Sequence, residues 1–501
     1  MRLRSKLLQS LYKRLTTGGS TEEQAVKSGV WVTGINIGDR VLQLIKVVIL
    51  ARILSPAAFG LLGIALLSVA VLKQFSAIGF EQALIQHEDE DIDDYLSTAW
   101  IVKISRGIII ATISLLIAPM ISSFFNEPQA ASLIQVLGFT PLILGVQNPA
   151  VVYFEKNLNF HKEFVYQVGA RFVDLVVALI IALMYRSVWA LVAGIIGMNL
   201  LKLILSYIIH DFRPSVGFNI DYFKEMFSFG KWMFISSILI FLYGQGDDAF
   251  VGWFFTATSL GLYQVSYRFS NAPATEVTHI ISRVTFPAFS KVQNDVGRLR
   301  NGYFRSIQFS TIIAFPMAAG IAAVAPQFVP SVLGDQWGTM IPLMQVLALW
   351  GGLRAFGANG GSVFKAVGRP DIGVKIQALK VIIIAVLIYP AADLLGVVGV
   401  AWVIIGSTFI TLPLHLYFVL TIIQGTATKL LNLTFYPLVG SGIMFAVVRI
   451  FDAYMLDDIG VIELGALIVI GMIIYLSIMI GFEKQTKYEF RSLVDVFRQS
   501  L

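Results

Sequence analysis

The sequence predicts an all-α integral membrane protein with about fourteen transmembrane helices. Of its 501 residues 56% are hydrophobic and only 14% are charged, with a mean hydropathy of +0.77, whereas a soluble domain carries about a quarter charged residues. Apolar runs of roughly 20 residues, the length that crosses a bilayer, recur along the whole chain. No polar stretch between them is long enough to form a separate soluble domain.

The predicted spans are separated by turn signals, among them Ser55-Pro56, Glu127-Pro128 and Gly368-Arg369-Pro370. In chain order the predicted spans are 30–53, 59–80, 96–119, 131–153, 165–185, 188–209, 227–254, 258–282, 303–325, 339–364, 373–392, 395–423, 430–450 and 461–482. This order leaves a basic tail at residues 1–29 and a second tail at 483–501. The first tail has no apolar core ahead of small residues, so we expect no cleavable signal peptide.

The basic residues predict the orientation of the chain in the membrane. If both termini are cytoplasmic, 24 Lys and Arg residues lie on the inner side and 3 on the outer side. Such a bias is the positive-inside pattern of a multi-pass protein in the cytoplasmic, or inner, membrane. The acidic loop 87–94 also lies inside, but acidic residues count little in this rule. The net charge of +6 therefore reflects topology and does not indicate a nucleic-acid partner.

An internal repeat predicts two pseudo-symmetric six-helix bundles. Matches at a constant offset of 201 residues pair Gly29, Trp31 and Gly60 with Gly230, Trp232 and Gly261. A weaker match at offset 211 pairs Asn148, Val152 and Tyr153 with Asn359, Val363 and Phe364. Both copies begin on the same side of the membrane, so the repeat is parallel. The predicted bundles cover 30–210 and 211–424, and two additional helices follow at 425–482.

Polar residues gather on single faces of four predicted spans. They are Asn36, Asp39, Arg40, Gln43 and Lys46 on the first span, Gln167, Arg171 and Asp174 on the fifth, Gln264, Arg268, Asn271, Thr275 and His279 on the eighth, and Gln345 and Arg354 on the tenth. Steps of three and four residues place each set on one side of a helix. A charge at the bilayer centre costs about 2.5–3.5 kcal/mol, so these faces must line a wet cavity or pair with one another.

The cations on these faces favour an anionic substrate, because guanidinium groups bind phosphate oxygens in a bidentate manner. The candidate substrate-binding residues are Arg40, Lys46, Arg268 and Arg354, with Gln43, Asn36, Gln264 and Asn271 beside them. Other membrane cations have a simpler interpretation, in which their long side chains extend to the membrane surface. These are Lys103, Arg106, Lys202 and Lys380.

The buried acids are the candidates for coupling transport to Na⁺ or H⁺. They are Asp39, Asp174, Asp247 and Asp248. Under the 201-residue offset Asp247 is the counterpart of Lys46, so the two are hypothesised to form an ion pair across the cleft between the bundles. Arg171 and Asp174 lie one helical turn apart, and a purely structural pair is the alternative interpretation for them.

Signatures of enzymes and metal centres are absent from the sequence. There is no nucleotide-binding P-loop, no G-x-S-x-G elbow and no H-E-x-x-H motif, and the chain has no cysteine. We therefore expect no catalytic residues, no metal site and no cofactor other than a coupling ion.

Four segments resemble one family of transporters. They are 47–62, which holds the turn Leu54-Ser55-Pro56, and 75–86, 247–263 and 285–290. The chain is similar over nearly its whole length to the polysaccharide-transporter branch of the multidrug/oligosaccharidyl-lipid/polysaccharide (MOP) superfamily. The resemblance implies a flippase that moves lipid-(pyro)phosphate-linked glycans to the outer leaflet by alternating access.

The resemblance also implies partners. The expected ones are the lipid-linked glycan, membrane lipids, a glycan polymerase and glycosyltransferases. Two alternatives stay open at this point. One is a multidrug exporter for organic cations from the same superfamily, and the other is a non-transporting scaffold in an envelope-polysaccharide assembly complex.

Overall fold

The protein is helical throughout the part of the chain that the computed structural model describes. That part comprises residues 21–76, 93–157, 159–220, 222, 241–454 and 460–485, and it contains no β-strand. Several predicted features lie outside it: most of both tails, the acidic loop 87–94 apart from its last two residues, the start of the seventh span, and the repeat positions Gly230 and Trp232. The side chains of Thr275 and His279 also lie outside the described part.

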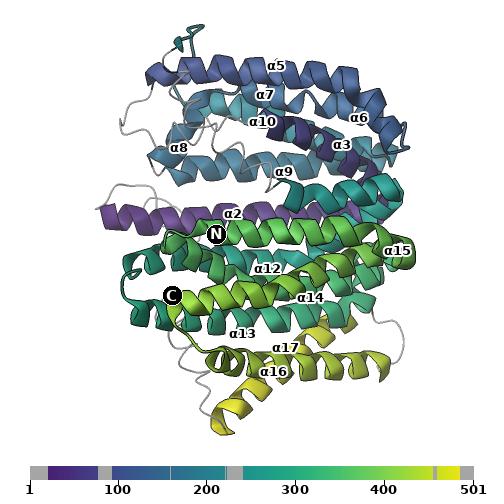
Figure 1. Ribbon diagram of the computed structural model, residues 1–501. Helices are drawn as coiled ribbons and strands as arrows, with labels where there is room; N and C mark the ends of the chain where they lie inside the picture. The colour runs from purple at the N-terminus through teal and green to yellow at the C-terminus, as the bar shows by residue number, and fades with distance from the viewer. Residues whose placement is uncertain are drawn as a thin grey trace, which may run out of the picture. The chain divides into compact units, whose positions relative to one another are not determined.

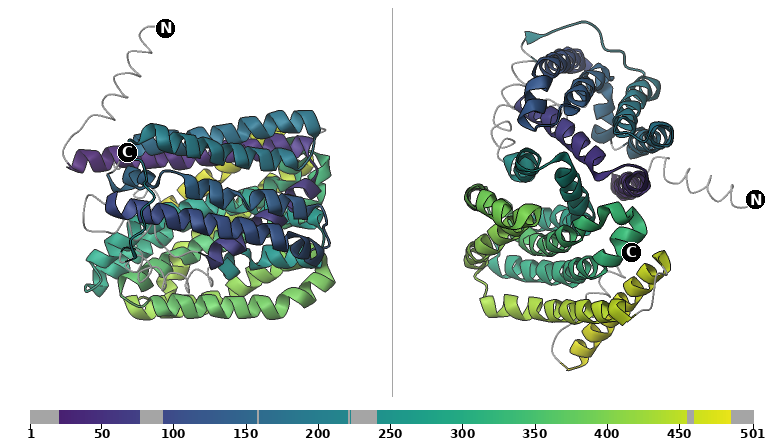
Figure 2. Two further views of the ribbon diagram at one scale, coloured as in Figure 1. Left: turned by 90° about the horizontal axis from the view of Figure 1, so that it is seen from above. Right: turned by 90° about the vertical axis from the view of Figure 1, so that its right-hand side faces the viewer.

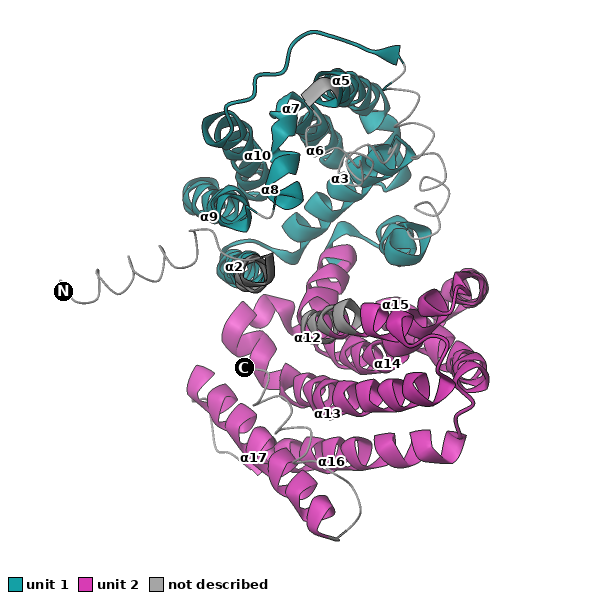
Figure 3. Cartoon of the chain, turned by 90° about the vertical axis from the view of Figure 1, so that its left-hand side faces the viewer, with its two compact units in different colours: residues 1–258 teal, residues 259–501 magenta. Residues whose placement is uncertain are grey.

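The chain divides into two compact units, residues 1–258 and 259–501 (Figure 3). The division falls in the first turn of α12 (Ala257–Lys291). The predicted bundle limits at 210 and 424 refer to the internal repeat and not to these compact units. The repeat stays a prediction. Each unit is described by itself below.

Unit 1 is a bundle of long helices that run lengthwise beside one another (Figures 1 and 2). Its elements are α2 (Thr21–Ile53), α3 (Pro56–Phe75), α5 (Asp93–Phe124), α6 (Ala130–Leu137), α7 (Thr140–Val146), the 3-10 helix η1 (Pro149–Val151), α8 (Val152–Lys156), α9 (Phe160–Tyr185), α10 (Trp189–Ile209) and a helix over 241–254. The turn between α2 and α3 is the predicted one, since Ser55 is extended and Pro56 opens α3. Proline suits this place because the first turn of a helix leaves its N–H groups unbonded.

The fourth predicted span is broken in the structure. Segments Ala130–Val146 and Pro149–Lys156 meet at an angle of 77°. At the break the Val146 carbonyl accepts hydrogen bonds from the indole N–H of Trp100 (3.2 Å) and from the Tyr207 hydroxyl (2.8 Å). Backbone groups freed at membrane depth need such partners, because the bilayer core offers no water. Two side chains from α5 and α10 therefore stabilise the break.

Unit 2 contains most of α12 and the C-terminal helices. The later elements are α13 (Val296–Phe328), the π-helix η2 (Val329–Leu333), the 3-10 helix η3 (Asp335–Met340), α14 (Ile341–Ala366), α15 (Pro370–Ile423), α16 (Ala427–Tyr454) and α17 (Val461–Gln485). The 54 residues of α15 are too many for one crossing at about 1.5 Å per residue. At Gly396 the backbone has φ 63° and ψ −151°, a conformation that interrupts the helix and favours glycine. This kink lies next to the predicted gap between spans 373–392 and 395–423.

The structure confirms the all-α membrane class but not the exact number of spans. Within the described residues nine helices are long and apolar enough to cross a membrane, or ten if the broken pair counts as one span. The helices α2 and α12, which bear the longest polar faces, are not among the nine, and α15 counts once. Fourteen spans therefore remain a prediction.

The close approach of α5 and α7 gives a test of the unit 1 packing. A Cβ atom on Gly107 would lie 2.5 Å from Leu142 Cα and 2.9 Å from the Pro141 carbonyl oxygen, so Gly107→Ala must push the two helices apart. We expect it to lower the free energy of unfolding by about 1–3 kcal/mol, the usual cost of overpacking. Thermal unfolding of the detergent-solubilised protein measures the change.

The matched control is Gly169→Ala on α9, where a Cβ atom has no neighbour within 4 Å. It should leave the melting temperature unchanged or raise it, since alanine favours helix. Equal losses at both positions would contradict the α5–α7 contact.

Candidate functional site

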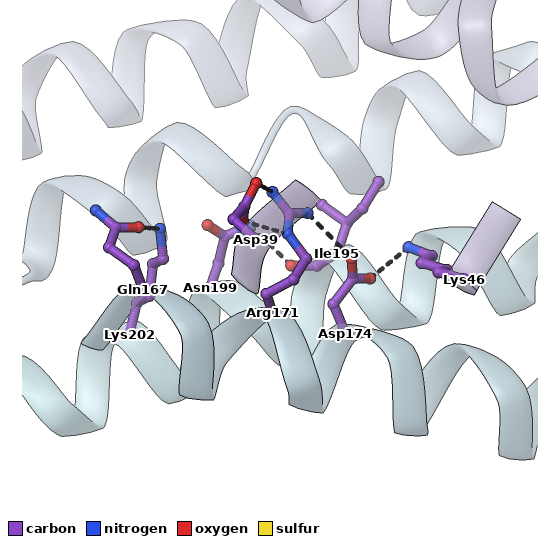
Figure 4. Close-up of polar contacts among 8 residues, drawn as sticks. All are labelled: Asp39, Lys46, Gln167, Arg171, Asp174, Ile195, Asn199 and Lys202. Atoms are coloured by element: carbon purple, nitrogen blue, oxygen red, sulfur yellow. Dashed lines mark hydrogen bonds and ion pairs between the residues drawn. The ribbon is translucent and has the colours of Figure 1, made fainter. Parts of the chain in front are cut away.

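Four charged side chains of unit 1 form a continuous network between α2 and α9 (Figure 4). The Arg171 Nε donates to Asp39 Oδ1 at 2.6 Å, and its Nη1 donates to Asp174 Oδ2 at 3.2 Å. The other oxygen of Asp174 accepts a hydrogen bond from the Lys46 ammonium. Two cations thus alternate with two carboxylates, and their charges balance.

The sequence spacing explains why these groups meet. Asp39 and Lys46 are seven residues apart, which is about two helical turns, and lie on one face of α2. Arg171 and Asp174 are three residues apart on α9, a spacing at which side chains are neighbours. When the two faces pack against each other, the cation of each helix meets an acid of the other.

Asp174 is the most deeply buried member of the network. Only 1% of this residue is exposed, and Lys46 is 8% exposed. A Cβ atom on Gly194 of α10 would lie 2.5 Å from Asp174 Oδ1, so the glycine leaves the space that the carboxylate occupies. A buried charge without a partner is strongly destabilising, and the two cations beside Asp174 offset that cost.

The network sharpens three sequence predictions. The polar faces of the first and fifth spans do pair with each other, and Arg171 does contact Asp174, as the structural interpretation expected. Lys46 was assigned to an anion-binding cavity, but its described partner is the buried Asp174 carboxylate. Its hypothesised pairing with Asp247 stays a prediction.

The remaining unit 1 candidates lie on the same elements as predicted. Arg40 and Gln43 are half-buried on α2, whereas Asn36 is exposed. Asp247 and Asp248 are half-buried in the helix over 241–254.

In unit 2 the candidate cation Arg354 is held by an aromatic pair. Its Nη1 donates to the Tyr267 hydroxyl at 3.3 Å, and its guanidinium carbon lies 4.9 Å from the centre of the Trp350 ring. Trp350 is fixed in turn by a 3.0 Å hydrogen bond from its indole N–H to Thr408. The hydroxyl and the ring together orient the guanidinium group of Arg354.

The α12 candidates differ in their surroundings. Gln264 and Arg268 are half-buried one turn apart. Asn271 is 2% exposed, and its amide donates to the Leu347 carbonyl of α14 at 3.5 Å. Asn271 therefore contacts the packed backbone of unit 2, where we had expected it to face a substrate.

Unit 1 also contains an open cavity of about 420 Å³ that the sequence did not predict. Lys103, Arg106 and Lys202, expected to extend to the membrane surface, line this cavity together with Lys73. Each helix contributes only one or two of these cations, so no stripe marks them in the sequence. The signal that could have found them is the Asn148-Pro149 pair, which breaks the neighbouring span.

No metal centre is found in the part of the chain that the structure describes, where no three His, Asp or Glu side chains are placed to share an ion.

A membrane-spanning helical fold with buried, balanced charges and a cation-lined cavity is typical of polytopic transporters, in which ionisable groups within the spans often mark the transport pathway. Residues 49–342 match the family described as polysaccharide biosynthesis protein, and the chain belongs to this family.

Two curated relatives cover most of the chain. The chain is 26% identical over 386 residues to the lipopolysaccharide biosynthesis protein WzxC of Escherichia coli K12. The aligned region covers 76% of this chain and 78% of the relative. The chain is 25% identical over 476 residues to the succinoglycan biosynthesis transport protein ExoT of Rhizobium meliloti, with 93% and 94% of the two chains covered.

Solved structures show the same fold. The inward closed conformation of the lipid II flippase MurJ superposes with a TM-score of 0.72 at 14% identity, over 90% of this chain and 99% of that one. An inward-facing multidrug resistance transporter of the MATE family, in the MOP superfamily, gives 0.60 at 16% identity, over 83% and 97%.

The ion network predicts an order of severity among three variants. Asp174→Asn removes the buried carboxylate that bonds both Lys46 and Arg171, so we expect a loss of about 3–5 kcal/mol in the free energy of unfolding. Lys46→Met should cost less, because Arg171 still pairs with both acids. The double variant Lys46→Met/Asp174→Asn keeps the Arg171–Asp39 pair and should be milder than Asp174→Asn alone. Unfolding in detergent micelles measures all three.

Asp371→Asn is the control, since Asp371 forms an exposed pair with Arg369. Surface pairs contribute about 0–1 kcal/mol. If the double variant proved as unstable as the sum of the two single changes, Lys46 and Asp174 would not be coupled.

Proposed function

We propose that this protein is a flippase that moves lipid-(pyro)phosphate-linked oligosaccharide or polysaccharide precursors across the cytoplasmic membrane by alternating access, with both termini in the cytoplasm. The proposal rests on one observation. This chain belongs to the polysaccharide biosynthesis family, and it has cationic side chains within its membrane helices. Cations at that depth are costly and therefore mark a function. The relatives act in lipopolysaccharide and succinoglycan biosynthesis, as their names state.

The chemistry of such a substrate fits these cations. A lipid-linked glycan has a (pyro)phosphate between an apolar tail, which remains in the bilayer, and a hydrophilic glycan. Arg354 presents a guanidinium oriented by Tyr267 and Trp350, and Arg268 lies on the same helix as Tyr267. A guanidinium suits phosphate oxygens because its N–H groups bind two of them at once.

A multidrug exporter for organic cations fits the site less well. Such a substrate needs an acid to bind it within the membrane. Asp39 and Asp174 are the acids of the network, and both already pair with Arg171. A non-transporting scaffold would likewise have no use for charges buried at such cost. We infer that the chain transports and is not an enzyme.

We further propose that the ion network couples transport to an ion gradient. A coupling ion that binds at the Asp174 carboxylate would weaken its bonds to Lys46 and Arg171 and so loosen α2 from α9. Asp247 and Asp248 are the second candidates for this role. The glycan polymerase and glycosyltransferases of the same pathway are the proposed protein partners.

Arg268→Ala tests the flippase. In proteoliposomes that contain only this protein and a fluorescent lipid-diphosphate oligosaccharide, we expect the initial flipping rate to fall at least about tenfold, since a charged hydrogen bond contributes about 1.5–3 kcal/mol. The readout is quenching of the outward-facing fluorophore by a membrane-impermeant reductant.

Arg298→Ala is the control, because the Arg298 side chain is 78% exposed at the start of α13. It should flip like the unaltered protein. If the protein were a scaffold, neither the unaltered protein nor Arg298→Ala would flip the glycolipid. If it were a multidrug exporter, it would transport an organic cation such as ethidium and would not flip the glycolipid. Either result would overturn the proposal.

A further inference from the structure

We propose that unit 1 contains a second anion site, a pocket for a phosphate or diphosphate group at the end of the unit where α3 ends and α9 begins. The pocket is the cavity of about 420 Å³ described above, and it is separate from the network between α2 and α9. Its volume lies within the range of pockets that hold small organic ligands.

Four cations from three helices line the pocket. They are Lys73 of α3, Lys103 and Arg106 of α5, and Lys202 of α10. Arg106 is held in place, because its Nε donates to the Ser76 hydroxyl at 2.9 Å and its Nη2 to the Lys73 carbonyl at 2.6 Å. The bond to the Lys73 backbone keeps two like charges close together. An anion between them would relieve their repulsion.

The wall also presents a buried polar donor. Gln147 is 7% exposed, and its side-chain carbonyl accepts a 2.7 Å hydrogen bond from the Tyr166 hydroxyl. Its amide nitrogen has no hydrogen-bond partner among the described residues, and Gln147 is one of the residues that line the pocket. A buried donor left unsatisfied costs about 1–3 kcal/mol, so a ligand oxygen at this point would be stabilising.

The break in the fourth span lies at the same wall. Gln147, Asn148 and Pro149 all line the pocket, at the 77° bend between α7 and η1. Irregular backbone at membrane depth occurs where it lines a cavity, and transporters bind substrates at such interrupted helices. The break therefore also points to a ligand, independently of the cations.

Two carboxylates, Glu155 and Glu163, also line the pocket. Glu163 lies within electrostatic range of Lys202, and one of its oxygens has no described partner. Against four cations the two acids leave an excess of two positive charges. That excess matches a doubly charged phosphate or a diphosphate better than a neutral sugar.

Under the predicted orientation this end of unit 1 faces the cytoplasm, the side on which a lipid-linked precursor is loaded. The same chemistry occurs in the phosphate of an anionic lipid headgroup. Assignment of the pocket to the substrate's diphosphate rests on the proposed flippase function. Binding of a phosphate group does not.

The probe for the site is inorganic pyrophosphate. We expect the full-length protein, in nanodiscs of phosphatidylcholine, to bind it saturably in isothermal titration calorimetry. Lys103→Gln/Lys202→Gln should weaken binding at least about tenfold, the usual effect of losing charge-assisted hydrogen bonds. Gln147→Leu should weaken it measurably while keeping every charge.

Lys162→Gln is the matched control. Lys162 lies in the first turn of α9, next to Glu163, but does not line the pocket. It should bind pyrophosphate as the unaltered protein does. Absence of saturable binding, or equal weakening in Lys162→Gln, would overturn the proposal and indicate a diffuse positive potential. If the double lysine variant melts early, Gln147→Leu decides the test.

Two further arms identify the source of the phosphate. If phosphatidylglycerol in the nanodisc competes with pyrophosphate, the pocket takes a lipid headgroup. If only a diphosphate-linked glycolipid competes, it takes the substrate. Retained pyrophosphate binding in a protein that flips no glycolipid would refute the flippase and leave the site standing.

Discussion

The lack of water in the bilayer core is the constraint on which this structure depends. Every polar group at membrane depth must find its partner within the protein. The rule explains why the chain is helical, and it explains the local exceptions as well. The carbonyl freed where the fourth span breaks is bonded by Trp100 and Tyr207. Both oxygens of Asp174 are likewise bonded, one by Lys46 and the other by Arg171.

The features that depend on local sequence were predictable. Hydropathy and turn signals gave the membrane class and the positions of most helices, and a step of three or four residues placed the polar faces on α2 and α9. The partners across those faces were not predictable. Lys46 and Asp174 are 128 residues apart, and only the packing of α2 against α9 brings them together. The sequence alone does not distinguish a Lys46 that binds a substrate from a Lys46 that pairs with a carboxylate of the protein.

The predicted repeat pairs two asparagines that are followed by different residues. Asn148 and Asn359 match in the sequence, and both are buried. Proline follows Asn148, which is extended at φ −60° and ψ 118° because proline disfavours helix at the preceding residue. Glycine follows Asn359, and α14 continues through it as a helix that carries a hydrogen bond from Asn359 to Ser310. The cation-lined cavity therefore lies at a break whose Asn-Pro sequence has no equivalent at Asn359-Gly360.

The ion network also limits how unit 1 can deform. Sliding α2 along α9 would break contacts to Arg171 and Lys46 at once, and Gly194 brings α10 so close to Asp174 that no side chain fits between them. While these bonds hold, α2, α9 and α10 are expected to move together as one rigid group of helices. The Ser55-Pro56 turn is the direct connection from these three helices to α3, so a displacement of α2 is passed to α3 through this turn.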